Sequence, residues 1–179
     1  LAEHARFEEV AYLLHYGKLP TQAELSDYIT RLQGLRDLPA ALKQALEAIP
    51  GDAHPMDVLR SGCSLLGNFE PEDDNQPQVL VADRLLAAFP SMLLYWWRFH
   101  QDGKRIDTVT DDDSVAGHFL HLLHGKAPSD FHRRVLDVSL ILYAEHEFNA
   151  STFTARVIAA TLSDFHSAIT GAIGALRGP

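Results

Sequence analysis

The sequence contains a single cysteine, Cys63, among 179 residues. One cysteine cannot form an internal disulfide or a cysteine-based metal cage, so nothing requires an oxidising compartment and a cytoplasmic location fits best. Basic residues are also scarce, since 15 Lys plus Arg stand against 24 Asp plus Glu, a formal net charge of -9. With no basic block anywhere, this balance argues against nucleic acids and anionic membranes as partners.

Long hydrophobic runs are absent as well. The most apolar stretch, Leu85 to Trp97, is interrupted by Pro90 and flanked by charged residues. It is shorter than the roughly 20 residues that a membrane-spanning helix needs, so we expect no membrane partner. The first residues, LAEHARFEE, contain early acids and no initiator Met, unlike a signal peptide or a natural start. We therefore interpret the chain as one globular piece of a longer protein.

Helix signals recur along the chain, and strand signals hardly appear. Gly17 ends a first helical pattern, and Thr21 with Glu24 forms a capping box that begins a second. Pro90, inside the longest pattern, predicts a kink or break near Phe89. We expect helices over 2–16, 21–34, 39–49, 56–66, 79–100, 114–125, 129–143, 151–162 and 167–176, and a solvated loop over 68–77. This series of helices, with short loops and no fixed repeat, predicts a single all-α unit.

Two of the predicted helices have distinctive surfaces. Val135 to Tyr143 is apolar on every side, so we expect this helix to be buried all round. The last helix instead carries small residues, which let another backbone come close: Ala168, Gly171, Ala172, Gly174 and Ala175. Glycines inside a helix are costly unless packing compensates, so this face packs either within one subunit or against a second copy.

Three histidines, His118, His121 and His124, recur every three residues in GHFLHLLHG. Steps of three turn a helix by about 300°, so the outer two lie about 120° apart. Three imidazoles on one metal would need a shared face and a supporting carboxylate, neither of which is evident at this spacing. We therefore expect partly buried structural histidines and no metal site. The adjacent Trp96 and Trp97 are likewise typical of a core or an interface, not of a base-stacking platform.

The segment EHEFNAST, Glu145 to Thr152, directly follows the apolar helix. It is not the zinc-protease pattern, because Ala150 stands four residues after His146. It concentrates an imidazole, two carboxylates, an amide and two hydroxyls between two apolar helices. Polar groups that end a buried segment need partners, and a ligand can be one of them. From the residues alone, a binding role and a structural role both stay open.

Longer runs carry a family resemblance. The run LYAEHEFNASTFTARVIAATLSDFHSAITGAIGALRGP, Leu142 to Pro179, resembles the stretch of citrate synthase relatives that leads into their catalytic histidine segment. Upstream, FEEVAYLLHYGKLPT, AHPMDVLRSGCSLLG and DDDSVAGHFLHLLHG resemble the 2-methylcitrate synthase branch in particular. The similarity covers essentially the whole chain. It implies that residues 1–179 form an internal piece of the large helical domain of this all-α family.

The resemblance also implies a Claisen-type condensation. Propionyl-CoA is deprotonated next to its thioester, attacks the ketone of oxaloacetate and is then hydrolysed; CoA enters only as a substrate thioester, and the family uses no metal. Electrostatic preorganisation and general acid-base catalysis would accelerate this reaction. His146 matches the family histidine that binds oxaloacetate, and Asn149 matches a neighbouring asparagine. Tyr143, nearly on the same helix face as His146, is a candidate wall of the acyl pocket or a plain core tyrosine.

The same resemblance implies what this piece lacks. The catalytic histidine and aspartate of the family match no position before Pro179, so the 179-residue piece alone should be inactive. Family members are homodimers, and we expect Gly171 at the interface between two copies. A citrate synthase that uses acetyl-CoA and a noncatalytic helical interaction module stay open as alternatives. One methylene is worth only about 1 to 3 kcal/mol in a pocket, so the sequence does not fix the acyl preference.

Overall fold

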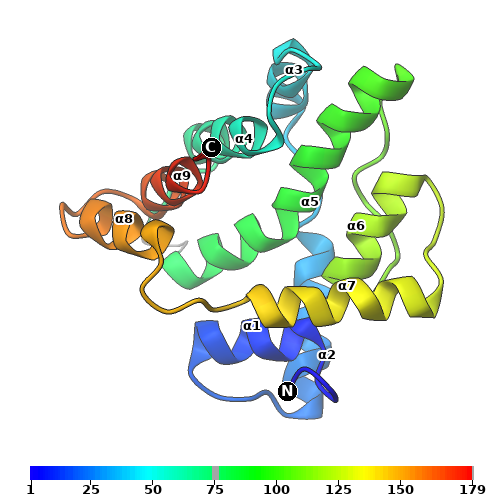
Figure 1. Cartoon of the computed structure of the whole chain (residues 1–179), viewed down its shortest axis with the longest axis vertical. Coiled ribbons are helices and arrows are strands. Elements are labelled where there is room, and N and C mark those ends of the chain that lie inside the picture. The colour runs from blue at the N-terminus through cyan, green and yellow to red at the C-terminus, as the bar shows by residue number, and fades with distance from the viewer. Residues whose placement is uncertain (74–76, 179) are drawn as a thin grey trace.

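The computed structural model describes residues 1–73 and 77–178. Within these residues the chain forms α1 (Phe7–Tyr16), α2 (Gln22–Gly34), α3 (Ala40–Ala48), α4 (Pro55–Phe69), α5 (Gln78–Asp102), α6 (Val115–His124), α7 (Asp130–Tyr143), α8 (Ala150–Ala159) and α9 (Phe165–Ala175). Figure 1 shows α5 between two groups of helices, with α3, α4, α8 and α9 on one side and α1, α2, α6 and α7 on the other. The all-α fold is confirmed. Part of the predicted loop over 68–77, residues 74–76, lies outside the described residues.

Local capping signals determine where most helices begin and end. The backbone N–H of Thr21 donates to the Glu24 carboxylate at 2.8 Å, and the N–H of Glu24 donates to Thr21 Oγ1 at 3.3 Å, which completes the predicted capping box. Ser129 caps α7 by accepting from the N–H of His132 at 3.3 Å. Gly125 ends α6 in the left-handed region, at φ 67°. These boundaries follow from neighbouring residues, which is why the sequence predicts them.

The first helix is shorter than predicted. It begins at Phe7 and not at Ala2, with Arg6 as its N-cap residue. The backbone N–H of Arg6 donates to the Glu9 carboxylate at 2.7 Å, so the helix start is satisfied there. Upstream, the carbonyls of Ala2 and Ala5 each accept a bond at 2.7–2.8 Å from Arg134 of α7. These contacts attach the N-terminal turn to α7 without extending the helix.

The core surrounds α5, which contributes to both of its apolar clusters. One cluster joins α5 to α3, α4 and α9 and includes Leu42, Leu46, Leu66, Met92 and Trp96. The other joins Ala87 of α5 to α1, α2 and α6. Full burial of a large apolar side chain stabilises a fold by about 1.5–3 kcal/mol, so these two clusters account for the arrangement of helices around α5.

Pro90 bends α5 without breaking it. The helix is continuous from Gln78 to Asp102, and its ribbon changes direction near the middle (Figure 1). Proline removes one helical hydrogen bond and crowds the preceding turn, so a bend is the expected response. Among the described helices, α5 alone is long and apolar enough to cross a membrane, and 61% of its most apolar window is buried inside the fold. Such burial is characteristic of a core helix.

The outer surface of α7 contradicts the expected all-round burial. Val135, Leu142 and Tyr143 are each at least half exposed. The helix packs against α1 and α6 on one side only, and Asp137 is its buried residue. The expectation was wrong because an apolar surface indicates that a partner is needed, without indicating whether that partner is in the same chain.

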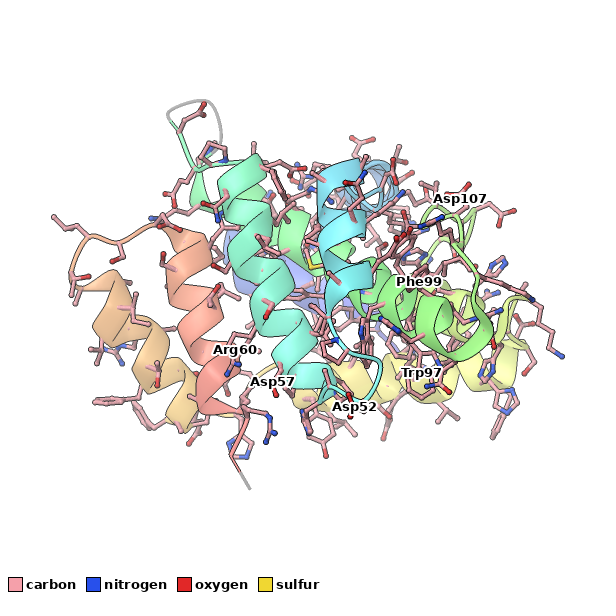
Figure 2. All side chains as sticks on the ribbon, turned by 90° about the horizontal axis from the view of Figure 1, so that it is seen from above. Asp52, Asp57, Arg60, Trp97, Phe99 and Asp107 are labelled. Carbon is pink, nitrogen blue, oxygen red and sulfur yellow. The ribbon has the colours of Figure 1, made fainter. Side chains whose placement is uncertain are left out.

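Helices α8, α9, α4 and α3 lie side by side in a row (Figure 2). Two glycines allow the closest approaches in this row. A Cβ on Gly67 would lie 2.8 Å from Cβ of His166, and a Cβ on Gly171 would lie 2.1 Å from Cδ1 of Ile158. Gly67 therefore brings α4 against α9, and Gly171 brings α9 against α8. The space beside Gly171 is filled by α8 of the same chain, which matches packing within one subunit. The expected contact of this face with a second copy stays a prediction.

Candidate functional site

Residues 144–149 form the loop that links α7 to α8, at the lower left in Figure 1. The Glu145 carboxylate accepts a hydrogen bond from the backbone N–H of Glu147. Glu147 occupies the left-handed region at φ 50°, and its carbonyl accepts from the N–H of Asn149 at 3.0 Å. The loop conformation is therefore held by bonds among its own residues.

His146 lies at the centre of this loop with an exposed side chain. Within residues 1–73 and 77–178, its imidazole makes no hydrogen bond or ion pair. A neutral imidazole carries one donor and one acceptor nitrogen, and the protonated ring carries two donors. Both ring nitrogens are therefore available to a ligand, as the candidate role of His146 requires.

Asn149 also has a structural role at the beginning of α8. It is the N-cap of α8, and its Oδ1 accepts from the N–H of Thr152 at 2.8 Å and from Ser151 Oγ at 2.5 Å. The predicted helix start at Ser151 or Thr152 was therefore displaced to the residue after Asn149. With Oδ1 occupied, the amide nitrogen of Asn149 is the group that can donate to a ligand.

Tyr143 is the last residue of α7, and 84% of its surface is exposed. Because the helix ends there, His146 is not on a helix with Tyr143, and the predicted shared helix face was wrong. Ala144 caps the end of α7 through its N–H, which donates to the carbonyl of Ile141. Within this chain Tyr143 is not part of the apolar core, and it lies directly before the loop that contains His146.

The three histidines of α6 occupy different environments. His118 is buried, with Nε2 3.2 Å from Ser91 Oγ and Nδ1 3.0 Å from Thr110 Oγ1. Burial, aided by the charge of Arg36, lowers the pKa of His118 to about 3. It is therefore a neutral structural histidine, as expected.

His121 and His124 do not share the environment of His118. His121 Nδ1 lies 2.6 Å from Asp112 Oδ2, and His124 is exposed. Asp111, Asp112 and His121 place their possible ligand atoms within 4.8 Å of one another. The histidine spacing gives no sign of the carboxylate beside His121, because Asp112 precedes the helix and lies outside its three-residue repeat.

A buried carboxylate cluster joins α1, α2 and α5. The Asp83 side chain is fully buried, and its oxygens lie 2.9 Å from His15 Nδ1, 2.8 Å from Tyr16 OH, 3.0 Å from Tyr28 OH and 3.0 Å from Arg31 Nη2. Burial would raise the pKa of Asp83, but the hydrogen bonds and the Arg31 charge hold it below its ordinary value. The cluster holds three helices together, far in sequence from the candidate loop.

An apolar cavity of about 350 Å³ lies among α1, α4, α5, α6 and α7. It is lined by Phe7, Leu59, Leu86, Phe89, Pro90, Leu93, Val115, Phe119, Leu136 and Leu140. A dicarboxylate needs polar partners when it leaves water, and this lining offers no polar side chain. The loop between α7 and α8, and not this cavity, is therefore the candidate site for a charged ligand.

The whole chain, residues 1–179, matches the family model described as the C-terminal domain of citrate synthase. The chain belongs to the citrate synthase family. Among relatives, it is 69% identical to the 2-methylcitrate synthase of Shewanella oneidensis over 179 residues, which cover 100% of this chain and 48% of that protein. It is 44% identical to 2-methylcitrate synthase 2 of Corynebacterium glutamicum, covering 100% of this chain and 49% of that protein. It is 39% identical to the citrate synthase of Synechocystis, covering 100% of this chain and 46% of that protein.

Solved citrate synthases have the same fold. The Thermotoga maritima citrate synthase matches with a TM-score of 0.85 and 37% identity, covering 100% of this chain and 47% of that one. The Thermoplasma acidophilum citrate synthase, solved as a ternary complex with carboxymethyl coenzyme A and oxaloacetate, matches with a TM-score of 0.88 and 28% identity. That match covers 99% of this chain and 47% of that one. This family member spans about half the length of the relatives it matches.

Proposed function

We propose that the full-length protein containing this chain is a 2-methylcitrate synthase. It condenses propionyl-CoA with oxaloacetate and water to give 2-methylcitrate and CoA, a step of propionate catabolism by the methylcitrate cycle. The observation that carries the proposal is the 69% identity to the Shewanella oneidensis enzyme over every residue of this chain. In the reaction, a base removes a proton next to the thioester, the resulting carbon forms a bond to the ketone carbon of oxaloacetate, and water then releases CoA. CoA is part of the substrate propionyl-CoA and is not a cofactor, and the proposed reaction uses no other cofactor.

In this proposal, the loop between α7 and α8 binds oxaloacetate. The exposed imidazole of His146 donates a hydrogen bond to the ketone or to a carboxylate of this dianion. The amide nitrogen of Asn149 is a second donor from the same loop, since only Oδ1 is used in capping α8. Tyr143, exposed at the end of α7, is the proposed wall beside the acyl group. This assignment is supported by the residues' positions in the family motif, by the unpaired imidazole of His146 in the described part of the chain, and by the amide nitrogen of Asn149, which capping does not use.

We further propose that residues 1–179 are an internal piece of the large helical domain, and that this piece alone is inactive. The support is the coverage of the relatives, about 48% in the Shewanella oneidensis enzyme. The catalytic histidine and aspartate of the family are then supplied by the remaining part of the full-length protein. A cytoplasmic location belongs to the same proposal.

The proposed full-length enzyme is a homodimer. Large apolar side chains on α7 and α8 are exposed in the single chain: Phe131, Val135, Leu142, Phe153 and Val157. No residue of α8 is buried, although this helix is largely apolar. Surfaces of this kind mark contacts with other protein, here supplied by the remaining polypeptide and by the second copy.

The test is steady-state kinetics on the full-length enzyme, with CoA release measured at saturating oxaloacetate. We expect a larger kcat/KM with propionyl-CoA than with acetyl-CoA. The opposite preference would assign the protein as a citrate synthase, the alternative favoured by the 39% identity to the Synechocystis enzyme. Absence of both condensation and oxaloacetate binding would leave the noncatalytic interaction module.

A further inference from the structure

We infer that Glu145 is a positioning residue, which fixes the direction of the His146 side chain toward oxaloacetate. This inference rests on the proposed function, because it gives His146 its substrate. The Glu145 carboxylate accepts the backbone N–H of Glu147, so the bond passes across His146 and closes a turn around it. His146, the proposed substrate-binding residue, therefore lies within a turn that the Glu145 side chain closes.

The turn needs such a restraint. Glu147 lies in the left-handed region at φ 50°, which residues with a Cβ seldom adopt unless their surroundings hold them there. The hydrogen bond from its N–H to Glu145 is a restraint on one side of this residue. On the other side, its carbonyl accepts from the N–H of Asn149 at 3.0 Å. His146 therefore sits directly before a backbone conformation that its neighbours impose.

Nothing else described in the structure orients the imidazole. His146 is exposed, and in the described part of the chain its ring has no hydrogen bond or ion pair. The backbone of residues 145–147 therefore sets where the Cα–Cβ bond of His146 points and which rotamers its side chain can adopt. A misplacement of about 1 Å at such a group can cost a large factor in rate, so a bond that fixes this backbone bears directly on oxaloacetate binding.

The role of Glu145 is separable from folding. Its side chain is exposed, so its removal leaves no cavity in the core. The helix ends on either side have their own caps, since the N–H of Ala144 donates to Ile141 at the end of α7 and Asn149 caps α8. Loss of the Glu145 bond should therefore loosen the loop while both helices remain.

The positioning role of Glu145 requires an acceptor oxygen and not a negative charge. A negative charge beside a dianionic ligand is unfavourable by itself, so the carboxylate is not there to attract oxaloacetate. Gln keeps an oxygen that can accept the N–H of Glu147 and removes the charge, whereas Ala removes both.

The test measures KM for oxaloacetate in the full-length enzyme. Glu145→Ala is expected to raise this KM about tenfold, with KM for the acyl-CoA unchanged. Glu145→Gln is expected to stay within about twofold of the wild type, because the acceptor oxygen is retained. Asp27→Ala, which removes an exposed carboxylate on α2, serves as the matched control and should leave both KM values unchanged. Hydrogen exchange at the Glu147 amide, followed by mass spectrometry, should be faster in Glu145→Ala alone.

The outcomes separate this inference from the proposed function. A raised KM in His146→Ala with an unchanged KM in Glu145→Ala would overturn the positioning role and leave the substrate assignment standing. Equal losses in Glu145→Ala and Glu145→Gln would also overturn it, because charge and not the hydrogen bond would then be responsible. An unchanged KM in His146→Ala would remove the substrate assignment and the positioning role together.

Discussion

Replacing Asp83 by Asn tests the buried cluster that joins α1, α2 and α5. The carboxylate is fully buried and receives four donor groups, from His15, Tyr16, Tyr28 and Arg31. Asn preserves the shape and one oxygen, but it turns the other oxygen into an NH₂ donor. The new NH₂ group then faces a donor group of the cluster inside the protein, and Arg31 loses its charged partner.

The expected cost can be worked from these contacts. Removing one partner of a buried ion pair costs about 3–5 kcal/mol when the other charge is left without compensation. Arg31 is 39% exposed, so water can solvate part of its charge, and one oxygen of Asn still accepts hydrogen bonds. We therefore place the loss at the low end, about 3 kcal/mol. This is a large fraction of the roughly 5–15 kcal/mol by which domains are stable.

The pH dependence of the folding stability is a second test of the Asp83 cluster. The folded-state pKa of Asp83 lies below its ordinary value, which means that the folded state favours the ionised form. The resulting stabilisation is fully present above the unfolded pKa, about 4, and is lost as the pH falls through the folded-state pKa. Asp83→Asn should lack this acid-dependent component.

The assay is urea unfolding followed by circular dichroism, at pH 7 and at a series of lower pH values. Asp27→Asn, at an exposed position on α2, is the matched control, and we expect its stability to be unchanged within about 0.5 kcal/mol. A loss below about 1 kcal/mol for Asp83→Asn, or an acid dependence identical to that of the wild type, would show that the Asp83 carboxylate does not stabilise the fold through these contacts.

Four further substitutions test the candidate site and the packing at two glycines. In the full-length enzyme, His146→Ala should weaken oxaloacetate binding and lower turnover with the helical fold intact, by about 1.5–3 kcal/mol for a donor to a charged group; unchanged kinetics at limiting oxaloacetate would contradict the assignment. Tyr143→Ala should change the ratio of kcat/KM for propionyl-CoA to that for acetyl-CoA more than it changes KM for oxaloacetate, and an equal loss with both acyl-CoA substrates would argue against an acyl wall. Gly67→Ala should destabilise the fold by about 1–3 kcal/mol, because its Cβ would meet Cβ and Cγ of His166 at 2.8 Å. Gly174→Ala should be neutral or stabilising by up to about 1 kcal/mol in the same unfolding assay, since its nearest neighbour is at 3.7 Å; equal effects at the two glycines would refute the packing argument.

Local signals made most of the fold predictable. The capping box at Thr21 and the stop at Gly125 depend on residues within one helical turn, so the sequence specifies them directly. The kink at Pro90 follows from the chemistry of proline. The beginning of α8 was misplaced by a residue or two, because Asn149, Ser151 and Thr152 are all acceptable cap residues and only the three-dimensional geometry selects one.

Contacts between distant segments were not predictable in the same way. Asp83 stands at the charged edge of an apolar run, and its partners come from two other helices. Small residues on α9 indicated close packing, but they did not specify whether Gly171 meets α8 or a second copy. The outer surface of α7 posed the same problem, since burial depends on a partner that an apolar pattern does not identify.

The sequence proposes residues for the candidate site, but it does not specify their geometry. His146 and Asn149 were proposed from the concentration of polar groups between two apolar helices and from the family motif, and their binding role stays a prediction. The bond from Glu147 to the Glu145 carboxylate was missed, because a left-handed residue other than glycine has no signal in the sequence. The helical relation assumed for Tyr143 failed for a related reason, since the helix ends at that residue.

A competition experiment between the two acyl-CoA substrates tests the proposed 2-methylcitrate synthase activity. The full-length enzyme is given oxaloacetate with equal concentrations of propionyl-CoA and acetyl-CoA, and the products are identified by mass spectrometry. Competing substrates form products in the ratio of their kcat/KM values, so the product ratio reports acyl specificity directly. We expect 2-methylcitrate to exceed citrate; an excess of citrate, or the absence of both products, would show that the protein is not a 2-methylcitrate synthase.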